Sequence, residues 1–224
     1  MKRNLDLIIF DLDGTLYPAN KAMDMGYPRA AIQLLARKTG RDLAEVEQEF
    51  LNRKEKLHSL INGKPTSTLT LLYYYDVSFD EFENEIDQVL DIDHYIQPDP
   101  KCVRVIQRIH AEYPLFLYTT NNAKVCRRIL KRLGLDTLFP EERRFTYTDA
   151  GKLDLPRREK LEYIKPGIKG FKHILNMHNS EPERTLMIGD SEVSDILPAR
   201  KLGFQTYHIT DRNSFYSLPE WLGI

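Results

Sequence analysis

The chain has 224 residues, 42% of them hydrophobic, so it can bury a substantial core and form one or two domains. Lys and Arg (32) nearly balance Asp and Glu (33), which leaves no electrostatic case for binding nucleic acid or a membrane surface. No apolar run approaches the ~20 residues of a membrane span, and the first apolar stretch is too short for an export signal. Cys102 and Cys126 fit reduced thiols, so we expect a soluble, cytoplasmic protein.

An apolar segment near the start of the chain ends at two closely spaced carboxylates. Residues 7–10 predict a buried strand of a parallel sheet, because strands covered on both faces are almost continuously apolar. Asp11 and Asp13 follow this strand, and Gly14 allows a sharp turn. Such strand ends are where open α/β sheets bind ligands, and a divalent cation would relieve the repulsion between the two acids. A turn with two solvated acids is the alternative.

A block of predicted helices, residues 19–97, comes next. Apolar residues at helical spacing predict helices at residues 30–37, 43–60, 66–75 and 79–90. Asn62 to Pro65 interrupts the pattern, and Ser78 is placed as the cap that opens the last helix. Because this block lies between the first strand and the remaining strands, we interpret it as an insertion into an α/β domain.

From residue 101 helices and strands alternate. The predicted helices cover residues 102–109, 123–133, 170–177 and 196–202. The predicted strands cover residues 115–119, 185–188 and 204–209. Strands separated by helices imply a parallel sheet with right-handed crossovers, so the predicted fold class is α/β.

Two later segments carry groups that suit a phosphate-transferring site. Thr119 and Thr120 come at the end of an apolar strand, where hydroxyls and backbone amides can hold phosphate oxygens. A helix N-cap is the alternative for this segment. Lys165 precedes a predicted helix, and taken alone it would be a solvated surface residue.

Another pair of acids follows the strand at residues 185–188. Asp190 lies just beyond that strand, and Asp195 comes five residues later on the next predicted helix. This placement suggests metal binding, with an N-cap as the alternative. The order of all these groups, and their repeated position at strand ends or loops, favours a single site.

These four motifs, from Leu5 to about Phe204, resemble those of the haloacid dehalogenase-like (HAD) hydrolase superfamily in residue type and order. The resemblance implies a Rossmann-like, three-layer parallel-sheet core of residues 1–18 and 98–224. It also implies that residues 19–97 form an inserted all-helical cap of the first type. The expected activity is Mg²⁺-dependent phosphate-monoester hydrolysis of small phosphorylated metabolites.

The resemblance assigns a role to each matching residue. Asp11 matches the nucleophile, which would form a phosphoaspartyl intermediate and bind the metal. Asp13 matches the general acid/base, which would protonate the leaving group and then deprotonate water, while its backbone carbonyl binds the metal. Thr119 matches the phosphate-binding hydroxyl residue, and Thr120 also fits that motif.

The third and fourth motifs supply the remaining charges. Lys165 matches the lysine that neutralises the nucleophile and the phosphate. Because the segment before it contains a basic insert, residues 151–160, Lys152 and Lys160 compete for this assignment. Asp190 matches the magnesium-holding aspartate, and Asp195 matches the supporting acid.

Asp13 and the helical block narrow the range of expected activities and substrates. Halide leaves without a proton, and true dehalogenases lack an acid at this position, so a phosphatase or a phosphomutase of the β-phosphoglucomutase type remains. The block is similar to the pyrimidine 5′-nucleotidase branch, which favours nucleoside 5′-monophosphates over phosphoglycolate or sugar phosphates. Lys64, Thr66 and Thr68 are candidates for leaving-group contacts, although the threonines could instead cap or pack a helix.

A non-catalytic regulator that binds phosphometabolites on the same scaffold is the least favoured interpretation. A protein that had lost catalysis would not need to keep Asp11, Asp13, Lys165 and Asp190 together. The sequence leaves the oligomeric state open.

Overall fold

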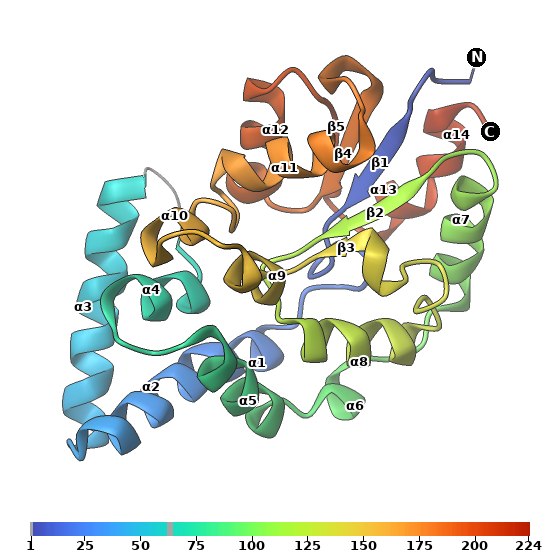
Figure 1. Cartoon of the computed structure of the whole chain (residues 1–224). Helices are drawn as coiled ribbons and strands as arrows, with labels where there is room; N and C mark the ends of the chain where they lie inside the picture. The colour runs from blue at the N-terminus through green and yellow to red at the C-terminus, as the bar shows by residue number, and fades with distance from the viewer. Residues whose placement is uncertain (1, 62–64) are drawn as a thin grey trace.

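The computed structural model describes residues 2–61 and 65–224, and it contains one parallel sheet (Figure 1). The strand order is β3-β2-β1-β4-β5. The strands are β1 (Leu7–Phe10), β2 (Leu115–Tyr118), β3 (Arg144–Phe145), β4 (Thr185–Gly189) and β5 (Gln205–His208). Every residue of β1, β2 and β4 is buried, which explains their continuous apolar character. The predicted α/β parallel-sheet fold is confirmed, whereas the two-residue strand β3 was not predicted.

Helices cover both faces of the sheet and complete a three-layer core (Figure 1). Helices α11 and α12 lie on one face, and α7, α8, α13 and α14 lie on the other. Their bounds are α7 (Pro100–His110), α8 (Ala123–Leu133), α11 (Ile168–His178), α12 (Leu197–Lys201), α13 (Arg212–Tyr216) and α14 (Leu218–Leu222). The last two helices were not predicted, and they pack against α7.

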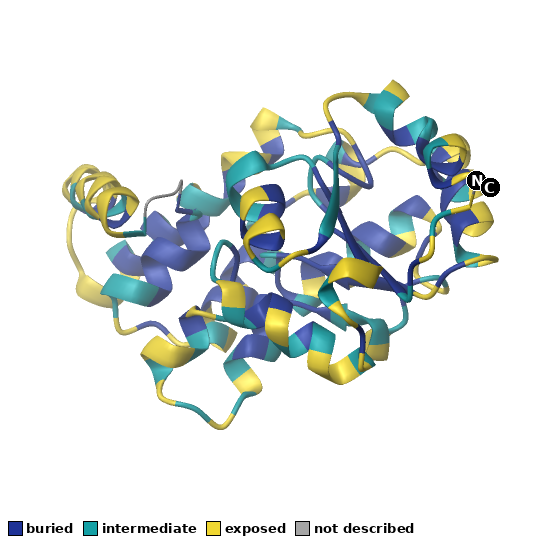
Figure 2. Ribbon diagram, turned by 90° about the horizontal axis from the view of Figure 1, so that it is seen from above, coloured by how far each residue is buried: buried dark blue, intermediate teal, exposed yellow. Residues whose placement is uncertain are grey.

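The helical block of residues 19–97 lies beyond the C-terminal ends of the strands (Figure 1). It consists of α1 (Lys21–Asp24), α2 (Gly26–Thr39), α3 (Leu43–Ile61), α4 (Ser67–Tyr74), α5 (Phe79–Val89) and α6 (Ile92–Tyr95). Helix α3 is the outermost of these and is largely exposed in Figure 2. Of its residues, only Val46, Phe50 and Leu57 are buried. Helices α2 and α4 each carry six buried residues, more than any other helix of the block.

Capping residues set the ends of several helices. Ser78 forms a capping box with Glu81 at the start of α5, as its position in the sequence predicts. The Asn122 side chain accepts a hydrogen bond from the Val125 backbone at the start of α8. Gly134 ends that helix in the left-handed conformation.

Two short helices that the sequence reasoning did not identify overlap the ends of the basic insert, α9 (Tyr147–Lys152) and α10 (Arg157–Leu161). The guanidinium group of Arg157 donates hydrogen bonds to the backbone oxygens of Leu72, Tyr75 and Val77, with distances of 2.6–3.1 Å. Arg157 therefore joins the insert to the last turn of α4 and to the segment between α4 and α5. The π-helix Glu192–Ile196 and the 3₁₀ helices Glu141–Arg143 and Pro182–Arg184 complete the assignment.

A second junction joins the helical block to α8. The buried Glu83 of α5 accepts hydrogen bonds from the backbone nitrogen of Lys124 (3.0 Å) and from Thr148 Oγ1 (3.3 Å). Arg128 on α8 pairs with Asp87 on α5 at 2.8 Å. A carboxylate at a helix N-terminus is stabilised by the helix dipole, so Glu83 suits this position.

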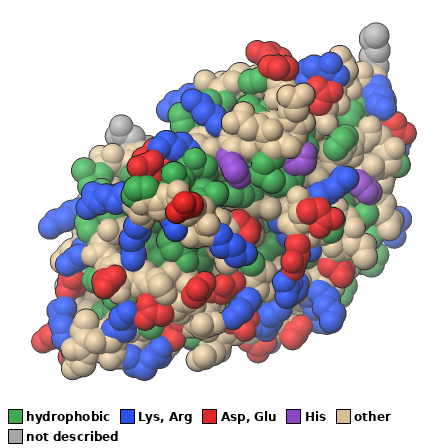
Figure 3. All heavy atoms as spheres, viewed as in Figure 1, with side chains coloured by type: hydrophobic (Ala, Val, Ile, Leu, Met, Phe, Trp, Pro, Cys, Tyr) green, Lys and Arg blue, Asp and Glu red, His purple; other side chains and the backbone are tan. Residues whose placement is uncertain are grey.

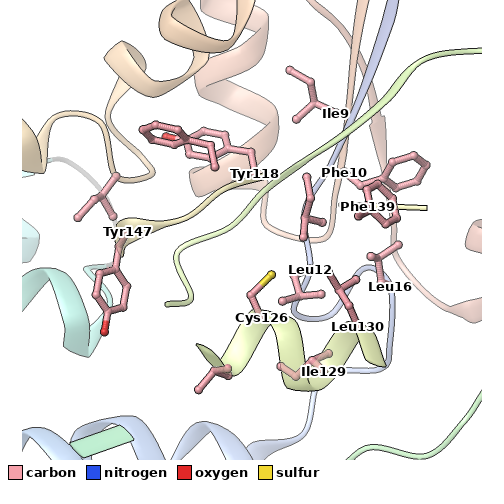
Figure 4. Close-up of a cluster of buried hydrophobic side chains, with 14 of the residues drawn as sticks. Ile9, Phe10, Leu12, Leu16, Tyr118, Cys126, Ile129, Leu130, Phe139 and Tyr147 are labelled. Carbon is pink, nitrogen blue, oxygen red and sulfur yellow. The ribbon is translucent and has the colours of Figure 1, made fainter. Parts of the chain in front are cut away.

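The turn after β1 is fixed by apolar packing. Leu12 and Leu16 are fully buried and lie over α8, from which Cys126 and Leu130 point toward them (Figure 4). Successive residues of an extended segment point to opposite sides, so this packing directs the neighbouring acids away from the apolar cluster. Cys126, like Cys102, is a free buried thiol.

The surface mixes charges of both signs. On the face shown in Figure 3, basic and acidic side chains are interspersed over the block and the core, in line with the near-zero net charge. Among the described residues, no helix combines the length and the apolar character needed to cross a membrane.

Candidate functional site

The ends of three neighbouring strands bring the predicted residues together. In the sheet, Phe10 of β1 lies opposite Leu117 of β2 and Ile188 of β4, so the three strands end at nearly the same level. The strand order reverses beside β1, with β2 and β3 on one side and β4 and β5 on the other. Such a reversal opens a crevice at the C-terminal edge of the sheet, where ligands bind in open α/β folds.

Asp11, Lys165 and Asp195 form a buried ion cluster at this edge. Lys165 Nζ donates to Asp11 Oδ1 at 2.5 Å and to Asp195 Oδ1 at 2.6 Å. The side chains of the three residues are at most 8% exposed. Thr15 Oγ1 donates to the other Asp11 oxygen at 3.3 Å. Both oxygens of the predicted nucleophile are therefore held in place by hydrogen bonds.

Lys165 reaches the cluster from the loop between α10 and α11. The hydroxyl of Tyr118, the last residue of β2, donates to the backbone oxygen of Tyr163 at 2.8 Å, which ties this loop to the sheet. The ammonium group lies 5.2 Å from the centre of the Tyr118 ring. The competing lysines lie elsewhere, since Lys152 pairs with Asp149 and Lys160 donates to the Gly151 backbone. Lys165 is thus the lysine that the structure places beside Asp11.

Asp190 and Asp195 complete a cluster of acids with Asp11. One carboxylate oxygen from each lies within 4.8 Å of the others. Close approach of the backbone requires glycine here, because a Cβ at Gly14 would collide with Asp190 and one at Gly189 would collide with Asp195. The second Asp195 oxygen accepts a hydrogen bond from the Ser191 backbone at 3.1 Å, within the turn that leads into the π-helix.

Burial and neighbouring charges shift the pKa values of the residues in this cluster. Burial, assisted by the neighbouring Asp11, raises the pKa of Asp190 to about 6. Burial also raises the pKa of Asp11 and of Asp195, and Lys165 opposes the shift in both cases. Burial alone would lower the pKa of Lys165, but Asp11 and Asp195 outweigh it and hold that pKa above its ordinary value.

The charges and donor atoms of this cluster fit a divalent cation. When ionised, three carboxylates face one ammonium group, so two negative charges remain uncompensated by the residues of the cluster. All the candidate ligand atoms are carboxylate oxygens, with no histidine or cysteine in the cluster. Hard oxygen ligands are those that Mg²⁺ and similar cations prefer.

Asp13 lies beside this cluster in a separate hydrogen-bond network. Asn121 Nδ2 donates to both Asp13 oxygens, at 2.9 and 3.0 Å, and Tyr17 donates a short hydrogen bond to Oδ1. Thr119 Oγ1 lies 3.4 Å from Oδ2. Burial, followed by repulsion from Asp11, raises the pKa of Asp13. Asp13 is therefore held by residues of its own loop and of the loop after β2.

A cavity of about 450 Å³ opens in front of Asp13 and is bounded on its other side by the helical block. Thr120 lines it, whereas the buried Thr119 hydroxyl accepts a hydrogen bond from the Asn121 backbone. Thr66 and Thr68 also line it, and Thr66 is at the same time the N-cap of α4. Lys64, the other predicted leaving-group contact, lies outside the described residues.

Sequence reasoning missed several residues of this site. Asn121 follows Thr119 and Thr120 and was not named as a candidate, yet its side chain contacts Asp13. Tyr17, four residues after Asp13, and Tyr27, on α2, were not singled out. The Thr-Thr-Asn-Asn pattern contained a signal for Asn121, while nothing in the local sequence indicates where the Tyr27 hydroxyl lies.

Solved structures of similar fold span almost the whole chain. A HAD phosphatase from Thermococcus onnurineus has a TM-score of 0.59 at 22% identity, with 98% of each chain covered. YfnB from Bacillus subtilis, solved bound to magnesium, has a TM-score of 0.56 at 18% identity, over 99% of this chain and 100% of that one. A 2-haloacid dehalogenase from Pseudomonas syringae pv. tomato DC3000 has a TM-score of 0.57 at 20% identity, with 98% of each covered.

The sequence itself identifies the family. The model of haloacid dehalogenase-like hydrolases matches residues 5–203, which include every candidate residue of the sheet edge. The chain therefore belongs to the haloacid dehalogenase-like hydrolase family.

Proposed function

We propose that this hydrolase is a Mg²⁺-dependent phosphatase that cleaves phosphate monoesters of small metabolites through a phosphoaspartyl intermediate on Asp11. One observation carries this proposal. A second carboxyl group, that of Asp13, lines the cavity next to the Asp11 cluster. An alkoxide leaving group needs a proton donor and a halide does not, so Asp13 favours phosphate esters over haloacids.

In the first step, a carboxylate oxygen of Asp11 attacks phosphorus, and the bond from phosphorus to the leaving oxygen breaks. Asp13 gives its proton to that oxygen, and the alcohol leaves. Lys165 stays charged and offsets the negative charge that gathers around Asp11 and the phosphoryl group. Thr119 and Thr120 offer hydroxyls to the phosphoryl oxygens from the loop after β2.

In the second step, water attacks the phosphorus of the phosphoaspartate while Asp13 takes a proton from it. The bond between phosphorus and the Asp11 oxygen breaks, which releases inorganic phosphate and restores both carboxyl groups. Asp11 and Asp190 would hold the cation, with the Asp13 backbone carbonyl as a further ligand and Asp195 supporting the cluster through Lys165. A bound Mg²⁺ supplies positive charge that lets the anionic phosphate approach the anionic nucleophile.

We propose further that residues 1–18 and 98–224 form the catalytic core and that residues 19–97 form a cap that selects the leaving group. A cavity of about 450 Å³ suits a small metabolite, and its hydroxyl-rich wall suits a polar one. Nucleoside 5′-monophosphates, with pyrimidines first, are the favoured substrates. Free buried thiols and the lack of a membrane-spanning helix among the described residues are consistent with a cytoplasmic enzyme.

A phosphate-release screen with Mg²⁺ over nucleotides, sugar phosphates and phosphoglycolate tests the proposal. Asp11→Asn should lower release on the order of 10⁴-fold or more, because it removes the nucleophile. Asp6→Asn is the matched control, since Asp6 precedes the same strand and pairs with Arg184 on the surface. A wild type that releases no phosphate from any class, or an Asp11→Asn variant with full activity, would overturn the proposal.

A phosphomutase would use the same residues. Sustained release of inorganic phosphate to solution without a bisphosphate activator would exclude it, because a mutase returns the phosphoryl group to its sugar.

A further inference from the structure

A chain of hydrogen bonds runs from the helical block to Asp13. Tyr27 is the second residue of α2, and its hydroxyl donates to Asn121 Oδ1 at 2.7 Å. The amide nitrogen of the same Asn121 side chain donates to both oxygens of Asp13, at 2.9 and 3.0 Å. A single amide group thus links a residue of the block to a carboxyl group of the core.

The backbone of Asn121 is fixed independently of this chain. Its nitrogen donates to Thr119 Oγ1 at 3.0 Å, and its carbonyl oxygen accepts from the Tyr147 backbone at 3.1 Å. The residue is only 2% exposed. Its remaining freedom is rotation of the side-chain amide, so the partners of that amide decide where its nitrogen points.

The two ends of the amide require different partners. Asp13 has oxygen atoms that accept hydrogen bonds, so it selects the amide nitrogen. The amide oxygen then needs a donor, and the Tyr27 hydroxyl supplies it. Without that hydroxyl, a buried oxygen would lose its partner, at a cost that favours rotation of the amide away from Asp13. Tyr27 therefore acts on Asp13 through Asn121.

The contact of Tyr17 with Asp13, unlike that of Tyr27 with Asn121, does not depend on the helical block. Tyr17 donates directly to Asp13 from the same loop, and the two residues form an isolated β-bridge. That contact persists wherever the helical block lies. Among the described residues of this network, Tyr27 is the member contributed by helices α1–α6, and it lines the same cavity as Asp13.

We propose that Tyr27 is a positioning residue. Through Asn121 it holds the Asp13 carboxyl group in the orientation that serves proton transfer, and it makes that orientation depend on the helical block being docked against the core. This role rests on the proposed function, in which Asp13 protonates the leaving group. It predicts that loss of the Tyr27 hydroxyl slows the release of a leaving group that needs a proton more than the release of one that does not.

Single-turnover measurements on the full-length enzyme test this role. The two probes are a nucleoside 5′-monophosphate, whose leaving alkoxide is strongly basic, and p-nitrophenyl phosphate, whose leaving group departs without a proton. Tyr27→Phe should slow alcohol release from the nucleotide on the order of tenfold, because only part of the general-acid effect is lost. It should slow p-nitrophenolate release less than about twofold, and KM for both probes should stay within about twofold.

Two further variants keep the test sharp. Tyr74→Phe is the matched control, since Tyr74 lies on another helix of the block and does not line the cavity. Asn121→Ala should show the same dependence on the leaving group as Tyr27→Phe. In the double variant the two effects should not add, because both substitutions break one chain of contacts.

The outcomes separate the two proposals. Equal slowing of both probes, no slowing of either, or additive effects in the double variant would overturn the role of Tyr27 while leaving the phosphatase intact. A wild type that releases product from neither probe would overturn the proposed function, and this role with it.

Discussion

The two sides of the candidate site, here called the sheet wall and the helical wall, are built differently. On the sheet side, the side chains of Asp11, Lys165 and Asp195 bind one another in a buried cluster, on loops that strand ends hold in place. On the side of the helical block, Lys54 donates to Ser67 at 3.3 Å and Thr66 caps its own helix, so these contacts are local to the block. The sheet wall is a fixed charge arrangement, whereas the helical wall presents Thr66, Ser67 and Thr68, small polar groups whose identity can change without altering the charges of the sheet wall.

The largest expected effect comes from removing the ammonium group of Lys165 from the sheet wall. Lys165→Met leaves Asp11 and Asp195 buried without their partner, so it should lower the free energy of unfolding by about 3–5 kcal/mol. Phosphate release should fall on the order of 10³-fold. Urea unfolding at neutral pH and an activity assay measure both quantities. Lys152→Met, at an exposed ion pair, is the control, and equal effects in the two variants would contradict a special role for Lys165.

A smaller effect is expected from Asp190, which the structure places at the edge of the acid cluster. Asp190→Asn removes a ligand charge and relieves the repulsion that raises its pKa, so the fold should keep its stability. The Mg²⁺ concentration needed for half-maximal activity should rise about 10- to 100-fold. Chelation by EDTA should abolish wild-type activity, and added Mg²⁺ should restore it. Glu192→Gln, on the exposed neighbouring turn, should leave the Mg²⁺ requirement unchanged.

Thr68 tests whether the helical wall selects substrates. Thr68→Val keeps the shape of the side chain and removes its hydroxyl from the cavity. We expect KM to change several-fold for some phosphate esters and little for others, with kcat for the best ester within about twofold, since the reacting groups lie on the other wall. A uniform change across all esters would speak against selection by this residue.

The smallest expected effect belongs to Thr66, on the same wall. Its hydroxyl accepts a hydrogen bond from the Leu69 backbone at 3.0 Å and caps α4. Thr66→Val should therefore lower the free energy of unfolding by about 1 kcal/mol and change the ranking of substrates little. Thermal unfolding and the same substrate panel distinguish capping from substrate contact, and an altered ranking at unchanged stability would favour contact.

The sequence predicted the sheet wall because its signals are local. Asp11 and Asp13 follow a continuous apolar strand, and Asp190 follows another, so the rule that parallel strands end at one edge brings them together. The central strands and most long helices were predicted as well, because apolar periodicity is also a local signal. Lys165 was assigned only through the resemblance to the family, because a lysine in a loop carries no local signal of burial.

The remaining features depend on contacts between distant segments. Strand β3 has two residues and exists because Leu117 and Tyr118 of β2 pair with it. Helices α9 and α10 overlap the ends of the basic insert, and with 6 and 5 residues they are too short for their apolar residues to show a helical period. Tyr27 and Asn121 are 94 positions apart in the sequence, and no periodicity or motif could predict that their side chains meet.

The contacts of Glu83 and Arg157 determine how the cavity can admit a substrate. Glu83 holds α5 against the core from a buried position, and Arg157 holds the last turn of α4 and the segment that follows it. Lifting the whole block away would break these hydrogen bonds together, whereas a rotation about the line of α5 and α8 would preserve those between α5 and α8. We therefore expect the substrate to enter through a hinge rotation of the helical block about its contact with α8. In that rotation α3, which lies farthest from α8 in Figure 1, should move most, and α5 should move least.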